Sequence, residues 1–448
     1  MRLLVLLLLL AQSLHSQTVR FPLKASSNKK YLAGIDNTPV YLNGCASWRL
    51  LFALRYDEAE GFLKDRKSAG FNAFMVQILP DPQLFDKGNS ELKLFLPFPF
   101  TGNDISKPNE SYFRHVDSIL ELCNKMNVVV LAAPLYLGCC QDGWLEIIQA
   151  DPDGVNKCRN YGTWVANRYK HLPNIIWVSG GDHDPVPEAI AFAEGIAAAD
   201  TIHLHSFHAH PGKSSGEKFK GTSWHTLSFA YTYFPALEMN KDWQYKQVYA
   251  MFYEENLNNY GMPVILAESA YEDERNATTQ IIRRQAYWSL LSGASGNIYG
   301  QNNIWRMDEK WKSALKKPGA ESMGIFYRFV QSIPWYNMKA DWAHTLVTGG
   351  RGNFNSTIYP GGEDYATAAL SNDSAVAAIY MPSYRKLCVN MKRFKNRMVN
   401  AKWFDPSSGK YKLSAVTYRN EGVEYFTPPA FKNEKGFDDW VLVLISHN

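Results

Sequence analysis

The strongest constraint on the fold of this chain is a regular alternation of short apolar runs with longer helical patterns. Eight runs have the composition of buried strands, at residues 39–48, 70–79, 127–138, 174–182, 201–210, 227–234, 263–268 and 296–301. Helical periodicity occurs between most of them, at residues 58–69, 112–126, 155–170, 188–199, 243–259, 277–292 and 309–332. Apolar strands that alternate with helices are typical of a parallel sheet covered by helices.

Eight strand–helix repeats predict an α/β fold of the (β/α)8 type, the TIM barrel. We place this barrel at residues 17–340. A doubly wound open sheet is the main alternative. Its dinucleotide-binding form is disfavoured, because no Gly-x-Gly-x-x-Gly motif follows the first strand-like run.

Two segments outside this repeat also have recognisable patterns. Residues 345–448 contain short strand-like pieces separated by turn sequences such as "YPGGED" and "FDPSSGKY". Closely spaced short strands predict a small C-terminal β-sandwich there. Residues 32–42 predict a hairpin around "GIDNTP", which either closes the floor of the barrel or begins its first strand.

The N-terminus has the features of a targeting segment. It reads "MRLLVLLLLLAQSLHSQ", in which Arg2 precedes an apolar run at residues 3–11. This run is too short to cross a bilayer. Small residues at Ser13 and Ser16 suit a cleavage site, so we predict a secretory signal peptide at residues 1–16. The expected mature protein is secreted or periplasmic and has no membrane partner.

The composition narrows the functional classes. The chain is 46% hydrophobic and 20% charged, which is ordinary for a globular protein. Its formal net charge is only +4, without a long lysine or arginine run, and this argues against a nucleic-acid partner. Aromatic residues make up 14% of the chain and can line a concave pocket. Such rings contact both the apolar faces and the hydroxyl groups of sugars, which suits a carbohydrate substrate.

Functional side chains of such barrels lie at the carboxyl ends of the strands. The residues at the predicted strand ends are Trp48, Gln77, Tyr136, Asp182, His208 or His210, Tyr233, Glu268 and Gln301. Asp182 and Glu268 are the two carboxylates in this set. Glycoside hydrolysis uses such a pair: one carboxyl group protonates the leaving oxygen, and the other attacks the anomeric carbon or activates water.

Each carboxylate also has a structural interpretation. Asp182 follows two glycines in "IIWVSGGDHD", and this pattern suits a turn or a helix N-cap. Glu268 follows "VILA" and could belong to an ion pair at a strand end, since an unpaired carboxylate there is costly unless it faces a site. The occurrence of both carboxylates on the fourth and seventh strands favours catalysis.

Four histidines, His203, His205, His208 and His210, lie close together on the fifth strand. Two histidines on one face, with a barrel carboxylate, could hold a metal ion, so a metal-dependent hydrolase is one alternative. We favour hydrogen bonding to substrate by His208 or His210, without a metal or another cofactor. A barrel that binds glycans without catalysis is a second alternative.

A few other residues carry weaker predictions. Tyr271 and Trp305 are expected to form sugar-stacking walls, although each ring could instead pack beneath a loop. Export permits disulfides, and Cys139 or Cys140 could close a loop with Cys158. No cysteine spacing resembles a zinc site.

Several longer segments resemble the apiosidase-like glycoside hydrolases of family 140. They are "YGTWVANRYKHLPNIIWVSGGDHD", "PVILAESAYE", "RRQAYWSLLSGASGNIYGQNNIW", "AGFNAFMVQ" and "YFRHVDSILELCNKMNVVVLAAP". The resemblance extends over residues 20–340. The tail, with "AKWFDPSSGKY", is similar to the β-domain that follows the catalytic domain in relatives. That domain is named for collagen binding, and we infer no ligand from the name.

The resemblance implies a (β/α)8 barrel and a retaining mechanism, with Asp182 as the acid/base and Glu268 as the nucleophile. It also implies release of apiose-linked units from pectic rhamnogalacturonan II. The chain differs from many relatives at two positions. Cys45 stands where they have Asp, and Tyr136 lies where they have Trp. Both positions are expected to touch the substrate.

Overall fold

The computed structural model describes residues 19–85, 92, 94–138, 143–233, 246–275, 277–354 and 363–447. The predicted signal peptide at 1–16 lies outside these residues. Within them, no helix combines the length and the apolar character needed to span a membrane.

Eight parallel strands form the sheet of the first domain, which confirms the predicted (β/α)8 architecture. They are β4 (Leu42–Ala46), β5 (Ala73–Gln77), β6 (Val129–Ala133), β7 (Ile175–Gly180), β8 (His205–His208), β9 (Ser228–Tyr233), β10 (Val264–Ser269) and β11 (Gly296–Tyr299). The order β8-β7-β6-β5-β4-β11-β10-β9 leaves the ladder open between β8 and β9, so the barrel is nearly closed. At this gap, the amides of Thr226 and Leu227 donate to the carbonyl oxygen of His205.

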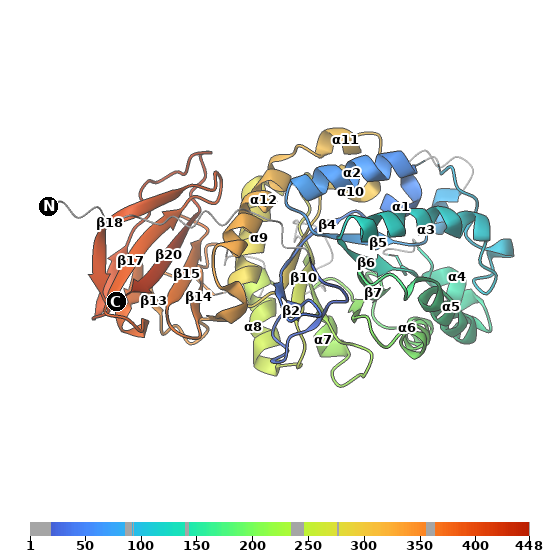
Figure 1. Cartoon of the computed structure of the whole chain (residues 1–448), viewed down its shortest axis with the longest axis horizontal. Helices are drawn as coiled ribbons and strands as arrows, with labels where there is room; N and C mark the ends of the chain where they lie inside the picture. Colours follow the sequence, from blue (N-terminus) through green and yellow to red (C-terminus); the bar gives the residue numbers. More distant parts are fainter. Residues whose placement is uncertain are drawn as a thin grey trace.

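Helices surround the barrel (Figure 1). They are α1 (Leu50–Ala53), α2 (Tyr56–Ser68), α3 (Glu110–Lys125), α4 (Leu145–Ala150), α5 (Gly154–Tyr169), α6 (Pro187–Ala199), α7 (Ser215–Lys218), α8 (Val248–Asn258), α9 (Thr279–Leu291), α10 (Asn302–Arg306), α11 (Trp311–Ala314) and α12 (Pro318–Gln331). The helix expected at 309–332 is two helices, because Pro318 at the first position of α12 starts a new one. Short 3-10 turns occupy Pro82–Phe85, Thr101–Asn103, Trp335–Asn337 and Met391–Arg393.

The N-terminal hairpin closes the floor of the barrel. Strands β1 (Lys24–Ala25), β2 (Leu32–Ala33) and β3 (Pro39–Val40) form a small antiparallel sheet just before β4. Leu32 and Val40 are buried in one cluster with inward-facing residues of the barrel such as Met75 and Ile176. Of the two alternatives for this hairpin, the structure therefore supports the floor.

The second domain is a β-sandwich, as expected. One sheet contains β12 (Met338–Ala340), β14 (Thr367–Ser371), β15 (Val376–Met381), β20 (Trp440–His447), β17 (Met398–Phe404) and β18 (Tyr411–Arg419). The other contains β13 (Val347–Gly349), β16 (Leu387–Asn390) and β19 (Val423–Phe426). Because β12 pairs with β14, residues 338–340 belong to the sandwich rather than to the barrel.

The sandwich packs on the barrel beside α9 and α12 (Figure 1). Arg283 of α9 forms two hydrogen bonds of 3.0 and 2.9 Å with the carboxylate of Asp439, and both side chains are fully buried. Next to this pair, the rings of Tyr287 and Tyr380 stack at 4.8 Å with an interplanar angle of 8°. The two domains therefore share a continuous packed interface.

Candidate active site

The glycine pair at the end of β7 is required by the local conformation. Gly180 and Gly181 have φ values of 84° and 135°, which favour glycine. A Cβ at Gly181 would lie 2.6 Å from the ring of Tyr136, and one at Gly180 would lie 2.7 Å from the carbonyl oxygen of His208. Asp182 follows in the left-handed region, with φ 47°, a conformation that aspartate tolerates better than most residues. The bend thus places the Asp182 carboxylate directly over the end of the strand.

Glu268 reaches the same end of the barrel from β10. The pairing of β10 with β9 is irregular on both sides of Glu268, between Leu266 and Glu268 and again between Glu268 and Ser269. Such irregularities re-aim a side chain at the rim of a barrel. One donor or acceptor atom from each of Asp182, His208 and Glu268 lies within 4.8 Å of the others.

His208 lies between the two carboxylates. Its Nε2 is 2.9 Å from Glu268 Oε2, and its Nδ1 is 3.3 Å from Asp182 Oδ1. Burial lowers the pKa of His208, but its hydrogen bonds and charge interactions with the two carboxylates outweigh burial and raise the pKa to about 9. Burial likewise raises the pKa of Glu268, while the hydrogen bond from His208 opposes this shift. The raised pKa of His208 therefore favours an imidazolium beside the two carboxyl groups at neutral pH.

The carboxylates face a cavity of about 310 Å³. Its walls are formed by Trp48, Arg49, Gln77, Asp81, Tyr136, Asp182, His183, His210, Pro211, Tyr231, Tyr233, Glu268, Tyr271, Glu274, Arg275 and Trp305. Asp182 and Glu268 keep 14% and 8% of their side chains exposed, so both are accessible from this cavity although largely desolvated.

The aromatic wall is held by hydrogen bonds. Trp48 Nε1 donates to the hydroxyl of Tyr271 at 3.1 Å, and that hydroxyl is also hydrogen-bonded to Glu268. Trp305 Nε1 donates to Glu274 Oε1 at 2.8 Å. The rings of Trp48 and Tyr136 lie 5.2 Å apart. A rigid ring-lined pocket with two carboxylates at its base matches the requirements of a sugar-binding hydrolytic site.

Comparison with known families agrees with this geometry. Residues 26–337 match the family described as "Apiosidase-like, catalytic domain". The chain belongs to the apiosidase-like family. Residues 357–445 match a second family, described as "Putative collagen-binding domain of a collagenase". A comparison with curated proteins found no similar sequence.

Two solved structures with the same architecture are described as glycoside hydrolases. One is 23% identical over 95% of this chain and 97% of its own length, with a TM-score of 0.79. Another, a glycoside hydrolase family 5 protein from Bacteroides vulgatus ATCC 8482, is 22% identical over 95% of this chain and 93% of its own, also with a TM-score of 0.79. These similarities establish the fold, and the match to the apiosidase-like family supports a glycosidase.

Most of the side chains predicted for the site meet in the apiosidase-like cavity. Asp182 and Glu268 lie together at its base, and seven of the predicted substrate-binding residues border it: Trp48, Gln77, Tyr136, His210, Tyr233, Tyr271 and Trp305.

Two predicted substrate-binding residues have other roles. Gln301 is fully buried and caps α10, where its Oε1 accepts from the amides of Asn303 and Ile304. His208 is 1% exposed, and its two ring nitrogens lie against the carboxylates of Asp182 and Glu268 rather than towards the cavity.

The position of Cys45 also differs from expectation. Cys45 is fully buried on the outer side of β4, in the core between strands and helices, so it cannot touch a substrate in the cavity. Cys158 is buried and free, while Cys139 and Cys140, its suggested partners, lie outside the described residues.

The histidine cluster separates in this apiosidase-like barrel. His203 Nδ1 lies 2.6 Å from Asp200 Oδ2, and His205 Nε2 lies 2.8 Å from the hydroxyl of Ser179. Burial lowers the pKa of His205 to about 3, so this ring is neutral. Of the four histidines, only His208 has a ring nitrogen close to both carboxylates, within 4.8 Å of an oxygen of each. The alternative of a metal ion held by two of these histidines and a barrel carboxylate therefore has no support in the described residues.

Several wall residues were missed from the sequence. Asp81 lies in the loop after β5 and forms an ion pair of 3.3 Å with Arg49. Glu274 and Arg275 belong to the loop after β10, and His183 follows Asp182 directly. Tyr231 could have been found, because it lies two residues before Tyr233 on β9 and strand alternation puts both on one face.

Proposed function

We propose that this chain is a retaining glycoside hydrolase in which Glu268 is the nucleophile and Asp182 the acid/base. The observation that carries the proposal is the close approach of these two carboxylates in one ring-lined cavity, with an oxygen of each within 4.8 Å of the other. Retaining pairs are separated by about 5–5.5 Å, whereas inverting pairs leave about 6.5–9.5 Å for a water molecule. The short separation supports retention.

The two carboxylates take the two roles of the retaining reaction. Asp182 protonates the departing oxygen while Glu268 forms a bond to the anomeric carbon, which gives a covalent glycosyl intermediate. Asp182 then takes a proton from water as that water attacks the same carbon. Glu268 is the more enclosed group, which suits a nucleophile that must meet the sugar without competing water.

The proposed substrate is a plant-type polysaccharide or oligosaccharide, with apiose-containing pectic chains as the first candidate. Family membership and the Trp and Tyr walls support this choice. Gln77 is 4% exposed, and within the described part of the chain its amide oxygen has no hydrogen-bond partner. A sugar hydroxyl that donates to this oxygen would satisfy it. The apolar run at residues 3–11 supports export to the periplasm or the medium, where such polymers occur.

Hydrolysis screens over pectic, hemicellulosic and host-type glycans, with product analysis, would identify the sugar. Proton NMR of the first product would show whether the anomeric configuration is retained. A 2-fluoro glycoside of that sugar should form a covalent adduct on Glu268. Glu268→Gln and Asp182→Asn should each lower turnover by about 100-fold or more. An inverted first product would contradict the retaining mechanism, and an absent adduct together with full activity of Glu268→Gln would exclude Glu268.

A further inference from the structure

One buried histidine connects the two proposed catalytic carboxylates. His208 is 1% exposed, and its Nε2 and Nδ1 lie 2.9 Å and 3.3 Å from Glu268 and Asp182. Its main chain is fixed to the same bend as Asp182, because the amide of Gly181 donates to the His208 carbonyl oxygen at 2.8 Å. The imidazole therefore lies in a fixed place with a carboxylate on either side and almost no contact with solvent.

Asp182, His208 and Glu268 form a triad of side chains. The number of protons that this triad can hold matches the number that the retaining reaction needs. That reaction begins with Glu268 ionised and one proton on Asp182. An imidazolium with two ionised carboxylates contains the same number of protons. His208 Nδ1 and Asp182 Oδ1 lie 3.3 Å apart as an ion pair, and the backbone amide of Asp182 also points at Nδ1 from 3.5 Å. Movement of one proton from Nδ1 to Oδ1 converts one arrangement into the other.

We propose that His208 is a positioning residue that stores the proton which Asp182 delivers to the leaving oxygen. The proposal rests on the retaining reaction proposed above. In the first step Glu268 bonds to the anomeric carbon, and the glycosidic C–O bond breaks with its electron pair on the leaving oxygen. That oxygen takes a proton from Asp182, which receives one from His208 Nδ1.

The second step restores the triad. Water attacks the anomeric carbon, and the bond between this carbon and Glu268 breaks with its electron pair on the carboxylate. Asp182 accepts the proton from water and returns it to His208 Nδ1. No other proton donor or acceptor is needed, because every proton that leaves the triad in the first step returns in the second.

The charges around His208 favour this cycle. The titratable groups that face it are Asp182, Glu268 and Tyr231 on the neighbouring strands, and the more distant Tyr136 and Tyr271 beside the cavity. Burial lowers the pKa of His208, and the two carboxylates raise it to about 9, so the stored proton is present at neutral pH. When Glu268 becomes a neutral ester, one of these two charges disappears. The pKa of His208 falls while this ester bond forms, which favours passage of its proton through Asp182 to the leaving oxygen.

Leaving-group dependence tests this role. His208→Gln and His208→Asn keep an amide donor for one carboxylate each, but neither side chain can carry the proton. The probes are phenyl and 2,4-dinitrophenyl β-D-apiosides, or the same aryl glycosides of the sugar identified by the product screen. Phenyl glycosides need protonation on departure, so their glycosylation rate should fall by about 100-fold or more. Dinitrophenyl glycosides need none, so their rate should change only a few-fold.

The result that would overturn the proposal is an equal loss on both probes, as a merely structural role predicts. Labelling of the wild-type enzyme with the 2-fluoro glycoside separates the two hypotheses. No adduct on Glu268 would reject the retaining reaction itself. An adduct with equal losses in the variants would reject only the role of His208.

A measurement on the wild-type enzyme covers the case in which both variants fail to fold. Nitrogen-15 NMR of labelled histidine should show His208 with both ring nitrogens protonated in the free enzyme at pH 7. In the enzyme trapped as the 2-fluoro glycosyl ester, its pKa should be lower by about one unit or more, because one neighbouring charge is lost. A neutral ring in the free enzyme, or the same pKa in both forms, would overturn the proposal.

Discussion

Tyr271 links the aromatic wall of the cavity to the proposed nucleophile. Its hydroxyl accepts from Trp48 Nε1 at 3.1 Å and is hydrogen-bonded to Glu268. Burial raises the pKa of Glu268, and hydrogen bonds from His208 and Tyr271 lower it. Tyr271 therefore affects both the shape of the pocket and the charge of the carboxylate.

Replacement of Tyr271 by phenylalanine should shift the acid limb of the kcat/KM profile to higher pH. Loss of the hydroxyl raises the pKa of Glu268, so a higher pH is needed to ionise it. A hydrogen bond to a charged group contributes about 1.5–3 kcal/mol, so kcat/KM below that limb should fall by about 10-fold or more. Tyr233→Phe is the control, because its hydroxyl lies 3.5 Å from Glu274 instead. An unmoved acid limb in Tyr271→Phe would contradict the assignment.

Gly181→Ala should disturb the site and lower the thermal stability. The new Cβ would lie 2.6 Å from the Tyr136 ring, at a φ of 135° that L-residues rarely adopt. Gly221→Ala is the matched control, because Gly221 also has a positive φ, 80°, but a Cβ there would meet nothing within 4 Å. Calorimetry should show a clearly larger loss of Tm for Gly181→Ala, together with a loss of kcat. Equal losses of Tm would mean that the contact with Tyr136 is unimportant.

At the level of elements, the barrel strands could be predicted because strands covered on both faces appear as continuous apolar runs. The predicted run 174–182 contains β7, and Asp182 does follow its end. The sequence pattern predicted that β11 ends at Gln301, which is too late. This strand stops at Tyr299, so Gln301 lies beyond it and caps α10. Apolar content locates a strand, but it does not define the residue at which the chain turns.

The remaining residues of the site could not be predicted from the sequence because their positions depend on loops and on contacts between distant segments. Arg49, Asp81 and Glu274 come from three segments without periodicity, and they meet only because the barrel brings different strand ends together. The role of His208 depends on two partners that are remote in sequence, Asp182 and Glu268. Neither kind of contact has a local sequence signal.

Helix α3 offers a test of capping outside the site. Asn109 caps it, accepting from the amide of Ser111 at 3.1 Å and donating to the carbonyl oxygen of Phe98 at 2.9 Å. Asn109→Ala should lower the free energy of unfolding by about 1–2 kcal/mol. The rate of hydrolysis should not change, because α3 contributes no residue to the cavity wall. Chemical denaturation measures the loss, and Asn109→Ser, which keeps an acceptor, should lose less. A Ser variant as unstable as the Ala variant would contradict the capping role.

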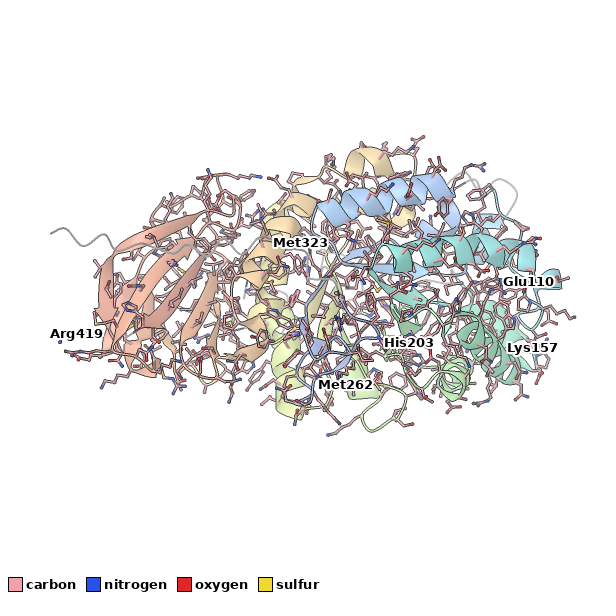
Figure 2. All side chains as sticks on the ribbon, viewed as in Figure 1. Glu110, Lys157, His203, Met262, Met323 and Arg419 are labelled. Atoms are coloured by element: carbon pink, nitrogen blue, oxygen red, sulfur yellow. The ribbon has the colours of Figure 1, made fainter. Side chains whose placement is uncertain are left out.

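At the scale of the whole molecule, the chain is an elongated pair of domains. Glu110 at the start of α3 and Arg419 at the end of β18 lie towards opposite ends (Figure 2). Among the residues that the structure describes, the cavity wall comes from residues between Trp48 and Trp305, all in the barrel. Because α9 buries Arg283, Tyr287 and Trp288 against the sandwich, we expect the sandwich to influence the site only through the stability of the barrel.

Asp439→Asn should destabilise the whole protein without changing the site. It leaves the buried Arg283 without its counter-charge, which costs about 3–5 kcal/mol. Lys435→Gln is the control at the same junction, since the Lys435–Glu321 pair is exposed and contributes little. Thermal unfolding should show a lower Tm only for Asp439→Asn. Below that Tm, kcat on a small glycoside should equal the wild-type value. A low kcat in the fully folded variant would indicate coupling between the sandwich and the cavity.

The small antiparallel sheet at the floor has a consequence for the order of events during turnover. Because Leu32 and Val40 are buried with the inward-facing residues at the floor of the barrel, we expect substrate and water to reach the described cavity from the end that holds the carboxylates. We then expect the released fragment to depart towards the same end from which water arrives. A dissolved alcohol that arrives first would receive the sugar instead, so the yield of transfer product should rise with alcohol concentration.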